Sequence, residues 1–131
     1  MKSENKMVGK RGEKLAREYL EKMGYMIIET NFYCRFGEID IIAKYNNEIS
    51  FIEVKTRGQD VFGKPAESVN CVKRNRIYKV AEFYTYIHEL YDVPMSLDVM
   101  EVYILEPHKA RVVHIKNAII DNPYDTFFKR G

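Results

Sequence analysis

Apolar and polar residues alternate with two different periods along the first half of the chain. Near its start, apolar side chains recur three and four residues apart, at Val8, Leu15, Ala16, Tyr19, Leu20 and Met23. This spacing predicts a helix over about residues 7–23, which Gly24 can close in the left-handed conformation. Three segments rich in Ile, Val, Phe and Tyr follow, at 25–34, 37–45 and 49–56, and they predict three consecutive strands.

The second half of the chain repeats this change from helical to strand period. Apolar positions at helical spacing continue for about six turns, at Val69, Val72, Ile77, Val80, Ala81, Tyr84, Ile87 and Tyr91. Pro94 predicts the end of this helix, and residues 95–105 and 112–116 predict two more strands. This order indicates an α/β sandwich with a central mixed sheet flanked by helices, because a helical crossover can bring the fourth strand parallel to its neighbour.

The break between the second and third predicted strands sets the register of a hairpin. It contains Asn46 and Asn47, and Asn tolerates the positive φ that a tight hairpin turn requires. If these two residues form the turn, residues paired across the hairpin have numbers that sum to 93. Asp40 then lies directly opposite Glu53, with a Cβ separation of roughly 4.5–5.5 Å.

The same register puts Glu38 opposite Lys55, and all four charged side chains project from the face that Phe51 also occupies. Like charges in directly paired positions are destabilising, and a cation relieves the repulsion. Mg²⁺ takes oxygen ligands, usually one or two carboxylates with water and substrate phosphate. The hairpin is therefore a candidate metal site, where Lys55 could hold or deprotonate the attacking water, or neutralise charge on a phosphate.

Two other interpretations fit the same spacing. In the first, the charged residues are solvated on the outer face of the sheet and Lys55 screens the carboxylates. In the second, the pair belongs to a retaining glycosidase, in which two carboxyl groups lie about 5 Å apart. The absence of Trp for sugar stacking and the adjacent Lys55 argue against a glycosidase.

Longer motifs resemble a known family. An Asp on one strand followed by Glu-x-Lys on the next looks like the PD-(D/E)XK nuclease superfamily. Four strings occur in order: Gly12-Glu13-x-x-Ala16-x-x-Tyr19-Leu20, Arg35-Phe36-Gly37-Glu38-Ile39-Asp40, Phe51-Ile52-Glu53-Val54-Lys55-Thr56-Arg57 and His114-Ile115-x-Asn117-Ala118. Together they closely resemble the YraN-like family of predicted bacterial endonucleases, which is similar to archaeal Holliday junction resolvases. This resemblance implies a restriction-endonuclease-like α/β sandwich.

The resemblance also implies roles for four residues. Asp40 and Glu53 match carboxylates that bind Mg²⁺ or Mn²⁺, and Lys55 matches the catalytic lysine. Glu13, on the first predicted helix, matches an acidic residue that approaches the same metal site in related resolvases. The four are the candidate catalytic residues, and Asp40, Glu53 and Glu13 are the candidate metal ligands.

Two positions depart from the expected pattern. Ile39 precedes Asp40 where the name of the superfamily has a proline, which the resolvase-like branch also lacks. Ser96 stands where an arginine is expected in this family, so a role for a basic residue there is not carried over.

Charge is distributed unevenly around a net value of +2. Residues 55–79 contain seven basic and two acidic residues, whereas residues 81–106 contain six acidic residues and no Lys or Arg. Such a positive region favours contacts with phosphates, so DNA recognised by shape is the expected partner; a solvated helix face is the alternative. The candidate nucleic-acid-binding residues are Lys10, Arg11, Arg57, Lys64, Lys73, Arg74 and Arg76.

Length and composition indicate one domain over residues 1–131, with a tail from about residue 121 that we expect to be loosely ordered. The charged first residues are not followed by an apolar stretch, which predicts a cytoplasmic protein without a signal peptide. Phe32, Tyr33 and Phe36 could stack on unpaired bases or form a homodimer contact, since similar resolvases act as dimers.

These observations favour a metal-dependent endonuclease that hydrolyses phosphodiester bonds in branched or structured DNA. The alternative is a nucleic-acid-binding or assembly module that retains the nuclease fold without its chemistry.

Overall fold

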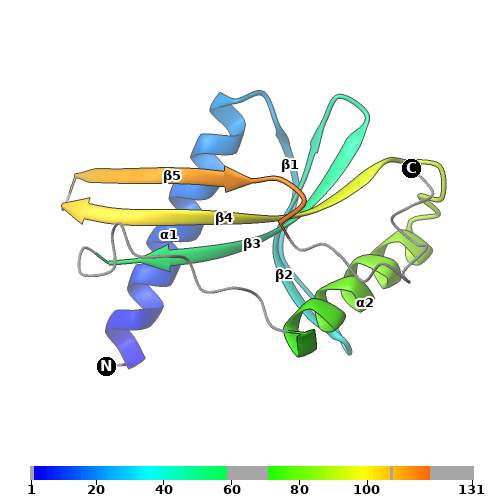
Figure 1. The fold of residues 1–131 in the computed structure, drawn as a ribbon, viewed down its shortest axis with the longest axis horizontal. Helices are drawn as coiled ribbons and strands as arrows, with labels where there is room; N and C mark the ends of the chain where they lie inside the picture. Colours follow the sequence, from blue (N-terminus) through cyan, green and yellow to red (C-terminus); the bar gives the residue numbers. More distant parts are fainter. Residues whose placement is uncertain (1, 59–70, 107, 119–131) are drawn as a thin grey trace.

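The computed structural model describes residues 2–58, 71–106 and 108–118 (Figure 1). Within these ranges the elements are, in order, α1 (Lys2–Lys22), β1 (Met26–Cys34), β2 (Gly37–Tyr45), β3 (Glu48–Arg57), α2 (Cys71–Ile87), β4 (Met95–Glu106) and β5 (Lys109–Ile115). The strands form one sheet in the order β1-β2-β3-β4-β5. Strands β3 and β4 are parallel and the other neighbours are antiparallel, which confirms the predicted mixed sheet. The predicted loosely ordered tail lies outside the described residues.

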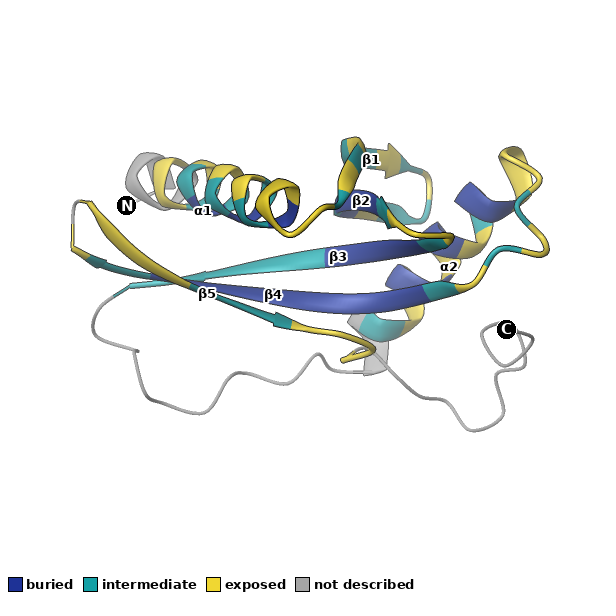
Figure 2. Ribbon diagram, turned by 90° about the horizontal axis from the view of Figure 1, so that it is seen from above, coloured by how far each residue is buried: buried dark blue, intermediate teal, exposed yellow. Residues whose placement is uncertain are grey.

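The two helices cover opposite faces of the sheet (Figure 2). One apolar cluster joins α2 to the sheet and includes Phe51, Val80 and Tyr84. The other joins α1 to the opposite face and includes Leu20 and Ile52. Phe51 and Ile52 enter different clusters because successive side chains of a strand point to opposite faces. The result is the predicted α/β sandwich.

Helix α1 ends as predicted, and α2 ends earlier than predicted. Gly24 adopts a φ of 94° directly after α1, as a left-handed helix cap requires. In α2, Glu89 has a φ of 55° and the Leu90 N–H returns to the Thr85 carbonyl at 3.0 Å. The helix therefore stops at Ile87, and Tyr91, predicted as part of its apolar stripe, is 64% exposed. The sequence missed this end because a Glu takes the left-handed position that Gly usually occupies.

The β2–β3 hairpin has the predicted register near its turn. Tyr45 pairs with Glu48, Asn46 has a φ of 54°, and the pairing continues to Ile41 opposite Ile52. The ladder ends at that pair. The predicted ladder pairs of Asp40 with Glu53 and of Glu38 with Lys55 lie beyond this end and are wrong, although Glu38 still pairs with Tyr33 of β1.

The physical reason is that β2 separates from β3 before these residues. Beyond Ile52, β3 continues to Arg57 paired with β4, whereas β2 stays with β1 (Figure 1). Gly37, at the start of β2, has a φ of 137°, and a Cβ there would lie 3.6 Å from the Val80 side chain. The start of β2 therefore lies close against α2, on the side where β2 has left β3.

Among the described residues, no helix is both long enough and apolar enough to cross a bilayer.

Candidate active site

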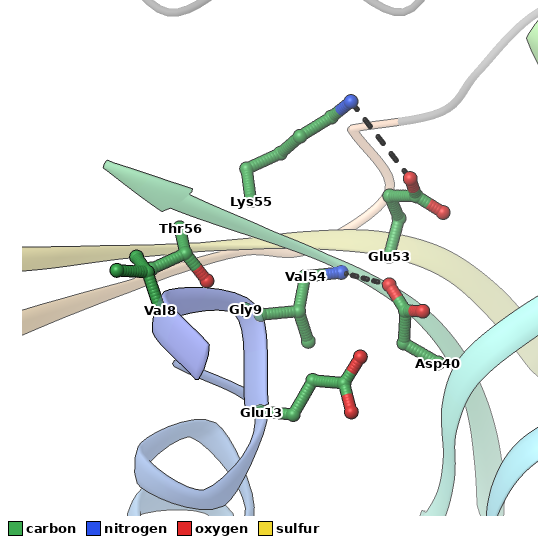
Figure 3. Close-up of a pocket in the computed structure, with 8 residues that line it drawn as sticks. All are labelled: Val8, Gly9, Glu13, Asp40, Glu53, Val54, Lys55 and Thr56. Carbon is green, nitrogen blue, oxygen red and sulfur yellow. Dashed lines mark hydrogen bonds and ion pairs between the residues drawn. The ribbon is translucent and has the colours of Figure 1, made fainter. Parts of the chain in front are cut away.

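A hollow of about 430 Å³ lies where β2 leaves β3 beside the first half of α1 (Figure 3). Eight residues from three elements line it: Val8, Gly9, Glu13, Asp40, Glu53, Val54, Lys55 and Thr56. The four candidate catalytic residues are all among them. The separation of the two strands thus opens the site that an uninterrupted ladder would close.

Asp40 lies at the edge of β3 that β2 has left. One oxygen of its carboxylate, Oδ2, accepts a hydrogen bond of 2.8 Å from the backbone N–H of Val54. Buried backbone donors need a partner, and this carboxylate serves a donor on β3 beyond the last β2–β3 pair. Asp40 is thereby fixed next to Glu53 by a side-chain contact in place of the predicted ladder pair.

Glu53 and Lys55 project from the same side of β3, as the strand period predicts (Figure 3). Lys55 Nζ lies 3.8 Å from Glu53 Oε1, and the two side chains are 21% and 14% exposed. Glu13 approaches from α1, on the other side of the strand, with Asp40 between them at the edge (Figure 3). The site therefore surrounds the edge of β3.

A glycine contact positions Glu13. Helix α1 crosses β3 so closely that a Cβ on Gly12 would lie 1.9 Å from Thr56 Oγ1 and 2.8 Å from Thr56 Cβ. No side chain larger than hydrogen fits there without movement of the strand or helix. The next residue, Glu13, lies on the same turn of α1 and lines the hollow.

Negatively charged side chains surround the buried carboxyl group of Asp40. Burial, followed by the nearby charge of Glu53, raises the pKa of Asp40 to about 7, with smaller contributions from Glu13 and Glu38. The hydrogen bond from Val54 acts in the opposite direction and lowers the pKa. A carboxyl group of this kind is half protonated near neutral pH, and a nearby cation would favour its ionised form.

The donor set suits a hard divalent cation. Asp40, Glu53 and Glu13 supply carboxylate oxygens alone, the ligand type that Mg²⁺ prefers, and Mg²⁺ needs one or two such groups beside water and phosphate. Among the described residues, no group of three or more His, Cys, Asp or Glu side chains lies close enough together to hold a metal ion, so these three carboxylates are not a preformed ligand set. These carboxylates therefore suit an ion such as Mg²⁺, most of whose ligands are water molecules or substrate oxygens.

The candidate nucleic-acid-binding residues do not all lie at this hollow. Lys10 and Arg11 precede Glu13 on α1. Arg57 follows Lys55 on β3, and its Nε lies 3.8 Å from Glu101 Oε2. Arg74 and Arg76 lie on the first turns of α2. Lys64 and the side chain of Lys73 are outside the described part of the chain.

A second polar group lies at the β4–β5 end of the sheet, and sequence reasoning did not identify it. Asp98 is fully buried, lies 2.7 Å from His114 Nε2 through its Oδ2, and accepts the Asn117 N–H at 3.0 Å through Oδ1. His114 has a structural partner here. His114 and Asn117 belong to one quoted motif and Asp98 to another segment, and only the β4–β5 pairing brings them together.

Comparison with known proteins shows where this chain has relatives. The model of uncharacterised protein family UPF0102 matches residues 12–102. A UPF0102 protein of Clostridium perfringens (strain SM101 / Type A) is 47% identical over 119 residues, which cover 90% of this chain and 98% of the relative. A UPF0102 protein of Caldanaerobacter subterraneus subsp. tengcongensis is 46% identical over 120 residues, which cover 89% of this chain and 98% of the relative. The range that matches the family model contains all four candidate catalytic residues.

Proposed function

We propose that this chain, which belongs to the uncharacterised protein family UPF0102, the YraN family, is a metal-dependent endonuclease acting on branched or structured DNA. The observation that carries this proposal is the group formed by Asp40, Glu53, Glu13 and Lys55 at the open edge of β3. Structural carboxylates rarely gather where burial and their own charges together raise a pKa to about 7, whereas active sites commonly contain such groups.

Each residue has a distinct role in this proposal. Asp40 and Glu53 would hold Mg²⁺ or Mn²⁺, and Glu13 would support the ion from α1. Such an ion, when bound, polarises the phosphate and stabilises the charge that develops on it. Lys55, whose Nζ lies 3.8 Å from Glu53 Oε1, would orient the attacking water or neutralise the charge that develops on the phosphate. The Val54 N–H keeps Asp40 oriented during these steps.

DNA is the substrate class that the charge distribution favours. Lys10 and Arg11 on α1 and Arg74 and Arg76 on α2 belong to helices on opposite faces of the sheet. Basic groups in this arrangement contact phosphates without reading bases, so recognition depends on the path of the backbone. Branched DNA, whose strands leave a junction in several directions, can contact both helices.

The test is incubation of the purified protein with linear, flapped and four-way DNA, with Mg²⁺, with Mn²⁺ and with EDTA. We expect cleavage that requires the metal and that is greater for the branched substrates. Glu53→Gln should abolish it, whereas Glu48→Gln, on the same strand outside the hollow, should not. Equal nicking by the wild type and Glu53→Gln would mean that another nuclease contaminates the preparation, and the absence of cleavage on every substrate would reject the enzyme.

A non-catalytic nucleic-acid-binding module is the second candidate. The observation that favours it is the contact between Lys55 and Glu53, which pairs the candidate catalytic cation with a candidate ligand. Under this alternative the charged group stabilises the strand edge and the helices bind DNA. Metal-independent binding of branched DNA without cleavage would support the module.

A further inference from the structure

A second hollow lies at the opposite end of the separated part of β2, between the β1–β2 turn and α2. It has a volume of about 340 Å³ and is lined by Phe36, Lys79, Glu82, Phe83 and Tyr86, which we call the aromatic hollow. Phe36 and Phe83 meet edge to face with ring centroids 6.0 Å apart. Tyr86 is 70% exposed, so its ring is available to a ligand.

The aromatic hollow uses the outer face of α2. Ile77, Val80 and Tyr84 bury the inner face of the helix in the core. Lys79 and Tyr86 lie two turns apart on the exposed side, and Arg76 is exposed one turn before Lys79. A solvated helix face needs no aromatic rings, whereas rings beside basic residues are the arrangement that binds single-stranded nucleic acid.

The β1–β2 turn adds another cation to this surface. The Arg35 guanidinium lies 4.8 Å from the centroid of the Phe36 ring, in cation–π geometry. Arg35 and Lys79 can therefore pair with phosphates on either side of a base held against the rings. Glu82, in contrast to Arg35 and Lys79, is acidic, and its carboxylate can accept hydrogen bonds from the exocyclic amino group of a base.

From this combination we infer that the aromatic hollow binds one unpaired nucleobase of the DNA that the candidate active site engages. The inference rests on the proposed function and makes its substrate more specific. Rings for stacking, a donor in Lys79 and an acceptor in Glu82 correspond to the faces and the polar edge of a base. A second copy of the chain fits less well, because a protein interface would remove water from the charged groups of Lys79 and Glu82, which is unfavourable.

The distance between the two hollows limits where the unpaired base lies. Phe36 and Asp40 are four residues apart along the chain, so their Cα atoms are at most about 14 Å apart. A stacked DNA strand advances about 3.4 Å per nucleotide. The base in the aromatic hollow is therefore within about four nucleotides of the phosphate at Asp40. The expected substrate is DNA with unpaired nucleotides this close to the cleaved bond.

The experiment measures base stacking without any need for turnover. A fluorescent adenine analogue, 2-aminopurine, is placed at successive positions of a single-stranded overhang, and fluorescence is recorded with the full chain in EDTA. We expect quenching at a position within about four nucleotides of the duplex end. Phe83→Leu and Tyr86→Leu should remove the quenching and weaken binding of overhang DNA by about 5- to 150-fold. Tyr91→Leu, exposed outside the hollow, is the matched control.

Binding of blunt duplex DNA should be the same for all these proteins. Quenching at no position, or an equal loss of duplex and overhang binding in the variants, would overturn the inference. So would a wild-type dimer that Tyr86→Leu converts to a monomer with quenching intact, since a second copy would then occupy the hollow. Cleavage of blunt DNA without quenching would reject base binding in the aromatic hollow and support the endonuclease activity. Quenching without cleavage of any substrate would support base binding in the aromatic hollow and reject the endonuclease activity.

Discussion

The carboxylate of Asp40 accepts the backbone N–H of Val54 at 2.8 Å, across the gap where β2 leaves β3. This bond joins the two halves of the candidate site. It gives β3 a hydrogen-bond partner beyond the last β2–β3 pair and holds Asp40 beside Glu53. It also keeps the carboxylate where burial and neighbouring charge oppose its ionisation. The same contact therefore supports the fold and, by stabilising the ionised carboxylate, offsets part of the effect of burial and of the neighbouring carboxylates on the pKa of Asp40.

The first prediction concerns the pH dependence of stability. The pKa of Asp40 is raised from 3.8 to about 7 in the folded protein, so the native state keeps a proton that the unfolded state loses between these values. Stability should fall as pH rises through this window. Asp40→Asn keeps an acceptor for Val54 and removes the titration, so at pH 8 it should be more stable by on the order of 1–3 kcal/mol.

Urea denaturation of both proteins at pH 4 and pH 8 measures this difference. Glu38→Gln is the matched control, because Glu38 is exposed and contributes less to the raised pKa of Asp40 than Glu53 or Glu13 does. Its stability should follow that of the wild type closely. An Asp40→Asn variant less stable than the wild type at pH 8 would show that the hydrogen bond outweighs the charge repulsion.

The second prediction concerns metal binding, which should stabilise the wild type and not Asp40→Asn. Mg²⁺ or Mn²⁺ that binds the folded state adds stability by mass action, about 2.7 kcal/mol at a hundred times its Kd. Wild-type Tm should therefore rise with either ion, and rise more at pH 8 than at pH 6, because the ion competes with a proton on Asp40. Asp40→Asn should show almost no rise, whereas Glu38→Gln should respond as the wild type does. Equal shifts in all three proteins would place the ion elsewhere.

The sequence was sufficient for the parts of the fold that local pattern specifies. The turn at Asn46 and Asn47 was enough to predict the correct register from Tyr45 to Ile41. The parallel placement of β4 followed from the crossover rule. The family resemblance was also correct, because its motifs extend over most of the chain.

The remainder depended on contacts between residues distant in sequence. Where β2 separates from β3, the start of β2 lies close to Val80, which is distant in sequence, and no property of Asp40 or Glu53 reveals this arrangement. Phe32, grouped with Tyr33 as a possible base-stacking residue, instead packs against Tyr84 in the core, with ring centroids 5.2 Å apart. Tyr33 is 76% exposed. An aromatic cluster in sequence was thus divided between core and surface by the strand period.

The third prediction separates chemistry from binding at Lys55. If Lys55 acts on the water or the developing charge, Lys55→Ala should lower the cleavage rate by about 10²- to 10⁴-fold. Affinity for the same DNA in EDTA should change little, because one phosphate contact at most is lost. Lys44→Ala, on the same hairpin outside the hollow, should leave both quantities unchanged. Equal losses of rate and affinity would show that Lys55 serves only to hold DNA.

The fourth prediction concerns the basic start of α2. If Arg74 and Arg76 contact phosphates, replacing either with Ala should reduce the slope of log affinity against log salt by about one. The sequence makes the same prediction for Lys73. Affinities measured from 50 to 200 mM salt give the slope. Lys22→Ala, at the far end of α1, is the control. An unchanged slope in the arginine variants would mean that this end of α2 faces solvent in the complex.

The last prediction tests how α1 is held against β3. A Cβ at Gly12 would lie 1.9 Å from Thr56 Oγ1, far inside contact distance, so Gly12→Ala forces the helix and strand apart. We expect a loss of about 1–3 kcal/mol, typical of overpacking, and a wider separation of Glu13 from Asp40. Gly9 offers a matched control on the same helix, because no heavy atom lies within 4 Å of a Cβ built there.

Gly9→Ala should therefore stabilise the protein by roughly 0.5–1 kcal/mol, as Ala does in place of Gly within a helix. Urea denaturation of the two variants gives opposite signs for the same chemical change, one turn apart. The displacement of Glu13 has a second consequence, because its charge contributes to the raised pKa of Asp40. Gly12→Ala should lower that pKa, which carboxyl NMR titration can measure. If both variants gain stability and the pKa stays near 7, α1 does not approach β3 at Thr56 as closely as described, and Glu13 does not belong to the site.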